Sequence, residues 1–261
     1  MTQDRPLRIL ISNDDGIHAE GLKVIERIAR KLTDDVWVVA PLTEQSGVGH
    51  ALTYRDPLRL VEITPRRYTV NGTPADCVIL AIEKLLKNHL PDLVLSGINH
   101  GENVAESLTH SGTVAVAMEA TLYGVPAISL SLATKEASPL YWESPEHFGP
   151  DLIRKLLDGI WPPHTFMNVN FPHLPINKIQ GIRAVRQGKR STPSHMVECI
   201  DPRGRPYYWV GIMREEENAV KESDIWALQQ GNITVTPVHM DMTNYAILKN
   251  LNAELSSNFN N

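Results

Sequence analysis

Two adjacent carboxylates, Asp14 and Asp15, directly follow an apolar run in the stretch "RILISNDDGIHAEG". Such a pair repels itself unless a positive charge lies between the two side chains. A purely local explanation is an Asx turn or a helix N-cap, because aspartate is favoured at both positions. The chemical explanation is a bound divalent cation, for which carboxylate oxygens are preferred ligands.

Short oxygen-bearing side chains recur in two later loops that leave apolar strands. The loop "EQSGVGH" carries Ser46, and the loop "SGINHGEN" carries Asn99 and Asn103. Carboxylate, hydroxyl and amide oxygens suit a hard ion such as Mg²⁺, Mn²⁺ or Ca²⁺, whereas zinc prefers histidine and cysteine. We therefore predict one divalent ion at Asp14 and Asp15, with neutral oxygens from Ser46 and Asn99 completing its shell. The residue types do not select among the three metals.

Donors for an anion follow in "THSGTVAVAMEA", where Ser111, Gly112 and Thr113 stand at the predicted start of a helix. The free backbone N–H groups and the positive end of the helix dipole favour a phosphate there. Ser111 can equally be a plain N-cap. Two carboxylates balance one divalent ion, so an incoming phosphate is not repelled. The ion would polarise a phosphoryl oxygen and lower the pKa of a bound water.

The elements that must position these residues alternate between strand and helix. Apolar strands are predicted at residues 8–12, 36–41, 91–99 and 126–132. A helix with Leu22, Ile25 and Ile28 on one face follows the first strand, and Thr73 is the predicted N-cap of another. This alternation is typical of an α/β fold, a Rossmann-like doubly wound and mostly parallel sheet. Ligands in such folds bind at the carboxyl ends of the strands, where Asp14 and Asp15 lie.

A second acidic pair, Asp34 and Asp35, serves as an internal comparison. It precedes the strand "VWVVAP" and so lies at the amino end of that strand, away from the expected cleft. We interpret this second pair as a solvated turn.

The chain divides into two parts by composition. Residues 1–185 are predicted to form the Rossmann-like catalytic core. Residues 186–261 are predicted to complete the sheet with "NITVTPVHM", to project a β-hairpin through the turn "DPRG", and to mediate oligomerisation. The stretch after Asn244 is expected to form a short helix and a polar tail.

Composition excludes several classes of protein. The net charge of −5 argues against binding of nucleic acid polymers or acidic membranes, which requires clustered Lys and Arg. Cys77 and Cys199 have no metal-binding or disulfide-framework spacing, which favours a reducing compartment. With neither a signal-peptide pattern nor a membrane-spanning run, the expected location is the cytoplasm. An NAD-linked dehydrogenase is disfavoured because the first turn, "NDDGIHAEG", is acidic and lacks GxGxxG.

The sequence resembles the SurE-type survival proteins, a family of divalent-metal-dependent 5′/3′-nucleotidases. Four blocks carry the resemblance, in the family's order and spacing: "ILISNDDGIHAEG", "VVAPLTEQSGVGHALT", "VNGTPADCV" and "PDLVLSGINHGENVAESLTHSGTVAVAMEA". The later stretches "DPRGRPYYWVG" and "ITVTPVHMDMT" are similar to the family's projecting hairpin and last sheet strand, so the resemblance extends over nearly the whole chain.

The resemblance implies a site and an activity. It implies a metal held by Asp14, Asp15, Ser46 and Asn99. The residues it places at the phosphate or in catalysis are Asp14, Asp15, Asn103, Ser111, Gly112 and Thr113. The implied enzyme is an acid-phosphatase-like phosphohydrolase that acts on nucleoside 5′- and 3′-monophosphates and, in some members, on short-chain polyphosphate. The family commonly forms homodimers or homotetramers through the hairpin and an exchanged C-terminal segment.

The mechanistic hypothesis is in-line attack on phosphorus by a metal-activated water, with the charge stabilised by the ion and the helix amides. Aspartyl-phosphate enzymes place two carboxylates with one residue between them, so the adjacent pair here argues against a covalent route. No general acid stands out. The alternative function is a non-catalytic stress sensor that binds nucleotide and metal without turnover.

Overall fold

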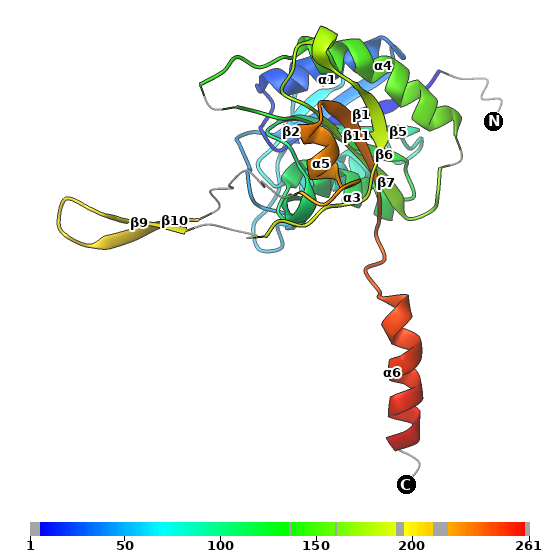
Figure 1. Ribbon diagram of the computed structural model, residues 1–261. Helices are drawn as coiled ribbons and strands as arrows, with labels where there is room; N and C mark the ends of the chain where they lie inside the picture. Colours follow the sequence, from blue (N-terminus) through cyan, green and yellow to red (C-terminus); the bar gives the residue numbers. More distant parts are fainter. Residues whose placement is uncertain (1–5, 136, 160, 192–195, 211–218, 259–261) are drawn as a thin grey trace.

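The computed structural model describes residues 6–135, 137–159, 161–191, 196–210 and 219–258. Among these residues, nine strands form one mixed sheet in the order β3-β4-β2-β1-β5-β6-β7-β11-β8 (Figure 1). The strands of this sheet are β1 Ile9–Ser12, β2 Val36–Pro41, β3 Leu60–Thr64, β4 Arg67–Val70, β5 Leu93–His100, β6 Ala127–Leu132, β7 Thr165–Phe171, β8 Gly181–Ala184 and β11 Asn232–His239.

The centre of the sheet is parallel. Strands β4, β2, β1, β5, β6 and β7 pair in parallel, whereas β3 and β11 run antiparallel to β4 and β7. Every residue of β1 and β6 is buried, as expected for central parallel strands that helices cover on both faces. The predicted α/β fold with a mostly parallel sheet is confirmed.

Helices cover both faces of the sheet. On one face, α1 Glu20–Arg30 packs beside α4 Glu143–Asp158 over Ile9 and Ile11. On the other face, α2 Pro74–Leu80 and α3 Gly112–Leu122 cover Leu10. The remaining helical elements are η1 Ala81–Leu85, η2 Ala105–Thr109, η3 Ile176–Lys178, α5 Asp224–Gln229 and α6 Tyr245–Asn258. None of the described helices combines the length and apolar character needed to cross a membrane.

Two helix starts follow from local sequence chemistry. The Thr73 hydroxyl accepts the backbone N–H of Asp76, and the Asp76 carboxylate accepts the backbone N–H of Thr73, which is a complete capping box. The predicted cap at Thr73 is therefore confirmed. Helix α1 instead begins after Ala19, which provides no side-chain cap. Asp14 and Asp15 are thus not the N-caps of this helix.

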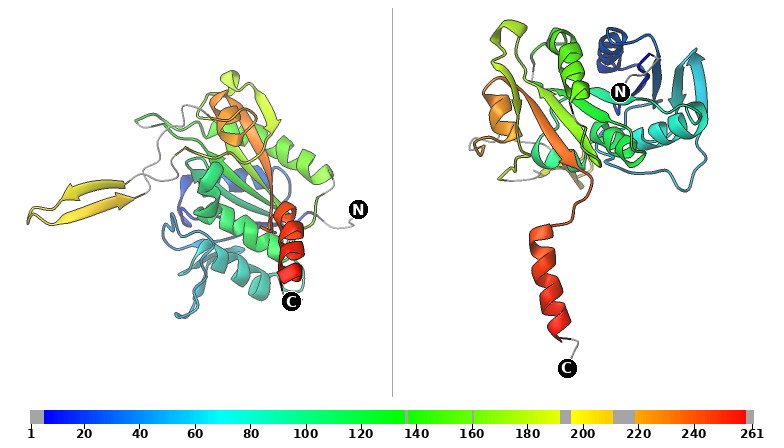
Figure 2. Two further views of the ribbon diagram at one scale, coloured as in Figure 1. Left: turned by 60° about the horizontal axis from the view of Figure 1, so that its bottom comes forward. Right: turned by 90° about the vertical axis from the view of Figure 1, so that its right-hand side faces the viewer.

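The C-terminal part adds β11 to the sheet and also forms elements outside the sheet. Strand β11 lies between β7 and β8, whereas β9 Met196–Ile200 and β10 Pro206–Val210 form a separate antiparallel hairpin. The predicted projecting hairpin is confirmed. Figure 1 and Figure 2 show this hairpin and helix α6 extending away from the body in different directions. Helix α6 spans 14 residues, longer than the short helix that we expected.

The comparison pair Asp34 and Asp35 departs from our expectation. Asp35 forms ion pairs with Arg8 at 2.8 Å and with Arg66 at 3.2 Å, and it accepts the indole N–H of Trp37. The interpretation of this pair as a solvated turn is wrong for Asp35. The reason is topological, because β1 and β2 are neighbours and bring Arg8 beside the start of β2.

Candidate metal and phosphate site

The carboxylate pair lies in the turn that leaves β1. The side-chain amide of Asn13 donates to the carbonyl of Gly16 at 3.0 Å, and Gly16 has a φ of +96°, which glycine adopts without strain. This turn buries Asp14, which is 4% exposed, and leaves Asp15 half-buried. The two carboxylates are therefore held at the carboxyl end of a central parallel strand, as predicted.

Burial makes this pair electrostatically costly. Burial is the largest cause, the hydrogen bond from Thr113 opposes it and the charge of Asp15 adds to it, and together they raise the pKa of Asp14 to about 6. Burial also raises the pKa of Asp15, with an added contribution from the charge of Glu44. Among the described residues, neither Asp14 nor Asp15 forms an ion pair with Lys or Arg. A buried and a half-buried carboxylate without a Lys or Arg partner among the described residues fit the requirements of a bound metal ion.

The loop after β2 reaches the pair through its main chain. The backbone N–H of Gln45 donates to the carbonyl of Asp14 at 2.8 Å. Ser46 is the next residue, but its hydroxyl donates to Glu44 at 2.8 Å and makes no described hydrogen bond to Asp14 or Asp15. Glu44, which the sequence analysis did not single out, adds a third negative charge beside the pair. Its one sequence signal is its position two residues before Ser46.

The carboxyl end of β5 also reaches the pair. The backbone N–H of His100 donates to Oδ2 of Asp15 at 3.3 Å. The adjacent Asn99 uses its amide nitrogen to donate to the carbonyl of Gly101 at 2.7 Å. This bond fixes the orientation of the Asn99 side chain and leaves its oxygen Oδ1 as the atom suited to a cation.

Asn103 is buried and forms its hydrogen bonds with residues of β6 and β7. Its side-chain nitrogen donates to Ser131 at 3.0 Å, and its carbonyl accepts the side-chain amides of Asn168 and Asn170 at 2.8 and 3.0 Å. No described contact joins Asn103 to Asp14 or Asp15. Asn168 and Asn170 alternate with apolar residues in "MNVNF", a pattern that the sequence analysis missed.

The start of α3 packs directly against Asp14. The Thr113 hydroxyl donates to Oδ1 of Asp14. At Gly112, an added Cβ would lie 2.7 Å from the Asp14 Cβ, so only glycine allows this approach. Ser111 accepts the backbone N–H of Val114 and is the N-cap of the helix. Gly112 and Thr113 are thus brought together with the first carboxylate, while Ser111 has the structural role that we considered for it.

The donor set fits a hard cation rather than zinc. Within the described part of the chain, no group of three or more His, Cys, Asp and Glu side chains has the arrangement of a metal site. A cation at Asp14 and Asp15 would therefore need the neutral oxygens of Ser46 and Asn99 as well. Oxygen-only coordination of this kind is typical of Mg²⁺, Mn²⁺ and Ca²⁺.

The fold is an α/β fold, and its acidic pair, Asp14 and Asp15, lies at the carboxyl ends of the parallel strands, where ligands bind in such folds. The N-terminus of α3, which suits an anion, lies beside this pair. The family description "Survival protein SurE" matches residues 9–194. Among similar proteins, "5'-nucleotidase SurE" of Paramagnetospirillum magneticum is 51% identical over 245 residues, 94% of each chain. The protein of the same name from Parvibaculum lavamentivorans is 47% identical over 97% of this chain and 92% of its own.

A solved structure is also similar. The crystal structure of the SurE protein from Aquifex aeolicus has a TM-score of 0.83 and 40% identity, and the match covers 93% of this chain and 97% of that chain. The chain belongs to the SurE family, as the sequence blocks predicted.

Proposed function

We propose that this protein is a divalent-metal-dependent phosphomonoesterase that hydrolyses nucleoside 5′-monophosphates, and also 3′-monophosphates and short-chain polyphosphate. Its relatives are named 5'-nucleotidase SurE, and the chain is a nucleotidase hydrolase of this family. The observation that carries the metal-dependent mechanism is the direct contact between the buried Asp14 carboxylate and the start of α3. A carboxylate that would bind a cation therefore lies beside backbone N–H groups that suit a phosphate.

In this proposal, Asp14, Asp15, Ser46 and Asn99 hold one Mg²⁺, Mn²⁺ or Ca²⁺ ion. When bound, the ion supplies Lewis-acid polarisation of a phosphoryl oxygen and lowers the pKa of a water.

The chain's own residues do the rest. The Thr113 hydroxyl keeps Asp14 oriented toward the site. The backbone N–H groups of Gly112 and Thr113 bind the phosphate, which needs fixed donors because its charge develops during attack. Asn103 gives one N–H of its side-chain amide to Ser131, and its second N–H would donate to the same phosphate.

Phosphate release from nucleotides tests the activity. The purified protein is incubated with each nucleoside 5′- and 3′-monophosphate, an aryl phosphate and polyphosphate, in Mg²⁺, Mn²⁺ or Ca²⁺. Phosphate release that a chelator abolishes and added metal restores supports the proposal. Binding of nucleotide without release under every metal would contradict it and would favour the sensor alternative.

Trapping of a phosphoenzyme tests the route of attack. In a covalent route, a carboxylate oxygen of Asp14 or Asp15 attacks phosphorus, the nucleoside leaves as its alcohol, and water later releases the phosphate from the aspartyl phosphate. Quenching within a single turnover, followed by borohydride reduction, would convert that aspartate to homoserine, which mass spectrometry of the digested protein would detect. Direct attack by water forms no phosphoenzyme, so both side chains should stay unmodified.

We also propose that residues 186–261 mediate assembly into a homodimer or homotetramer. The hairpin exposes Ile200, Trp209 and Val210, and α6 exposes Leu248 and Leu251 on one side. Such apolar surface on elements that extend from the body is typical of association surfaces. The molar mass in solution, measured by light scattering for the full chain and for a chain ending before α6, tests this. The division at residue 185 and the cytoplasmic location stay predictions.

A further inference from the structure

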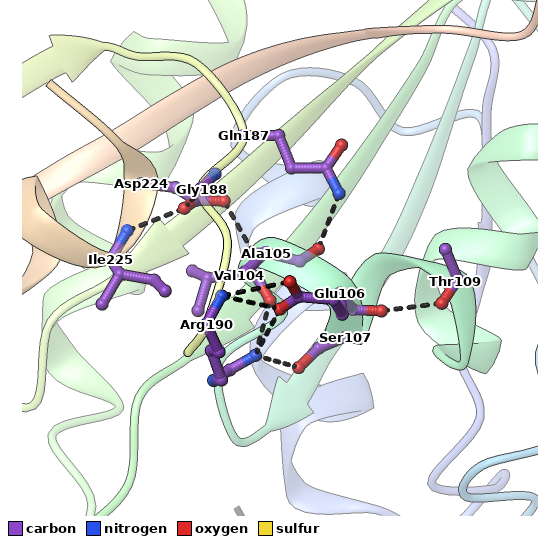
Figure 3. Close-up of polar contacts among 10 residues, drawn as sticks. All are labelled: Val104, Ala105, Glu106, Ser107, Thr109, Gln187, Gly188, Arg190, Asp224 and Ile225. Atoms are coloured by element: carbon purple, nitrogen blue, oxygen red, sulfur yellow. Dashed lines mark hydrogen bonds and ion pairs between the residues drawn. The ribbon is translucent and has the colours of Figure 1, made fainter. Parts of the chain in front are cut away.

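Three side chains from the C-terminal part fasten the segment that links Asn103 to Ser111. They are Gln187, Arg190 and Asp224, here called the clamp, and Figure 3 shows them converging on η2. Arg190 and Asp224 are buried. The clamp lies outside the carboxylate site, and the proposed mechanism makes no use of it.

The clamp holds the most strained residue of that segment. Ala105 has a φ of +50°, in the left-handed region that alanine disfavours. Its backbone N–H donates to Oδ2 of Asp224 at 2.9 Å, and its carbonyl accepts the side-chain amide of Gln187 at 2.8 Å. Both polar groups of the Ala105 backbone are therefore bound by the clamp, which stabilises a conformation that the residue would otherwise leave.

The Asp224 carboxylate accepts three backbone N–H groups. Besides Ala105, its carboxylate accepts the backbone N–H of Gly188 and of Ile225, each at 2.8 Å. An added Cβ at Gly188 would lie 2.6 Å from Oδ1 of Asp224, so this approach requires glycine. A buried carboxylate is costly, and burial raises the pKa of Asp224 despite these bonds. A group kept at such a cost, and linked to the segment before the site, points to a functional role.

Arg190 forms further hydrogen bonds with the same segment. Its guanidinium donates to the carbonyl of Val104 and to the hydroxyl of Ser107, each at 3.1 Å. Its backbone N–H donates to the carboxylate of Glu106 at 3.0 and 3.1 Å. The clamp therefore contacts the segment on both sides of Ala105, which leaves it little freedom to move.

We propose that Asp224 is a positioning residue for the reaction, acting with Gln187 and Arg190 on the Ala105 backbone. The segment 103–111 joins Asn103 to the start of α3, so its conformation determines where the phosphate-binding groups lie. A misplacement of about 1 Å at a reacting centre can cost about 100-fold in rate. The inference rests on the proposed phosphohydrolase function, and it assigns a catalytic contribution to the part of the chain that we expected to serve assembly.

The first test replaces the carboxylate with an amide of the same shape. In Asp224→Asn, an NH₂ group faces a backbone N–H, so one hydrogen bond is replaced by repulsion. We expect kcat/KM for a nucleoside monophosphate to fall about 10- to 100-fold. Amide hydrogen exchange across residues 105–110 should become faster. Gln187→Ala should show the same changes to a smaller degree. Because Gln187 is exposed, this variant still tests the inference if Asp224→Asn does not fold.

The matched control is Asp92→Asn. Asp92 is half-buried and, like Asp224, its carboxylate accepts a backbone N–H, that of Arg8 at 2.8 Å, but at the amino ends of the strands. This variant should lose stability and keep kcat/KM and the exchange rates of residues 105–110.

The second test is rescue at the strained residue. Glycine adopts a positive φ without penalty, so Ala105→Gly should remove much of the need for the clamp. The double variant Asp224→Asn with Ala105→Gly should recover part of the lost kcat/KM, a recovery that general destabilisation would not produce. Wild-type kcat/KM and exchange in folded Asp224→Asn would overturn the inference, as would a double variant no faster than the single one.

These readouts separate the two proposals. If the wild-type protein releases no phosphate from nucleotides, the proposed function fails, while the exchange measurement still tests whether the clamp orders the segment. If the wild-type protein turns over and Asp224→Asn matches it, only the clamp inference fails.

Discussion

The hydroxyl of Thr113, in the first turn of α3, donates a hydrogen bond to Oδ1 of Asp14, at the end of β1. One contact therefore joins the helix suited to phosphate with the first carboxylate of the predicted metal site. The contact also lowers the pKa of a carboxyl that burial raises. In the proposed site, cation binding and phosphate binding would therefore depend on the same pair of residues.

Removing this hydroxyl should weaken cation binding. Thr113→Val keeps the shape and deletes the donor, so the pKa of Asp14 rises further and the proton competes better with the metal. We expect Mn²⁺ affinity near neutral pH to fall about 10-fold, the size of one lost hydrogen bond to a charged group. Titration calorimetry measures this. Thr113→Ser keeps the donor and should bind Mn²⁺ nearly as the wild type does; equal affinity in the valine variant would contradict the role of the contact.

Asp15→Asn should separate activity from folding. The variant loses one of the two charges that hold the ion, so kcat/KM should fall at least about 100-fold, more than the loss of an outer-shell partner. The metal-free variant should melt at the same temperature as the wild type or higher, because a buried like-charge pair has been relieved. Thermal unfolding with and without Mn²⁺ tests this. Asp34→Asn, in the other acidic pair, should change neither quantity, and full activity in Asp15→Asn would refute the site.

The metal-free protein should lose stability as pH rises. The pKa of Asp14 is about 6 in the folded protein, against an ordinary value of 3.8. In that window the folded state binds more protons than the unfolded chain, so the free energy of unfolding falls as pH increases, in total by something on the order of 3 kcal/mol.

The effect of metal has the opposite sign. Mn²⁺ requires the ionised carboxylate, so the stabilisation that it gives should grow as pH rises through 6. Urea unfolding below and above this pH, with and without Mn²⁺, checks both slopes. Asp14→Asn should reduce the metal-free slope, and a remainder should persist because burial also raises the pKa of Asp15 and of Asp224; an unchanged slope in this variant would assign the titration to other groups.

Local chemistry explains how much of the fold was predictable. The largely apolar strands β1 and β6 are buried on both faces, and Thr73 and Ser111 cap their helices through bonds that span three residues. These features depend on nearby residues, so the sequence contains the whole signal. The position of Asp14 and Asp15 at the end of a central strand follows from the same local pattern.

Other features depend on contacts between distant parts of the chain. Asp35 pairs with Arg8 across two neighbouring strands, and Ala105 is held by Asp224 over 119 residues. The hydroxyl of Ser46 bonds to Glu44 rather than to the acidic pair, a rotamer that spacing cannot reveal. Such pairings arise from strand order and loop paths, which periodicity does not encode.

Gly21, in the first turn of α1, should contribute to the stability of the fold rather than to chemistry. An added Cβ would lie 1.8 Å from the carbonyl oxygen of Ile98, so α1 could approach β5 only if the backbone moved. We expect Gly21→Ala to lower the free energy of unfolding by about 3 kcal/mol, the upper range for overpacking in a rigid core. Urea unfolding measures the loss. The matched control is Gly159→Ala, because its φ is −80° and its added Cβ would meet nothing closer than 3.5 Å. Equal stability of the two variants would mean that α1 can move away from β5 at little cost, and that this close approach does not hold the turn of Asp14 and Asp15 in place.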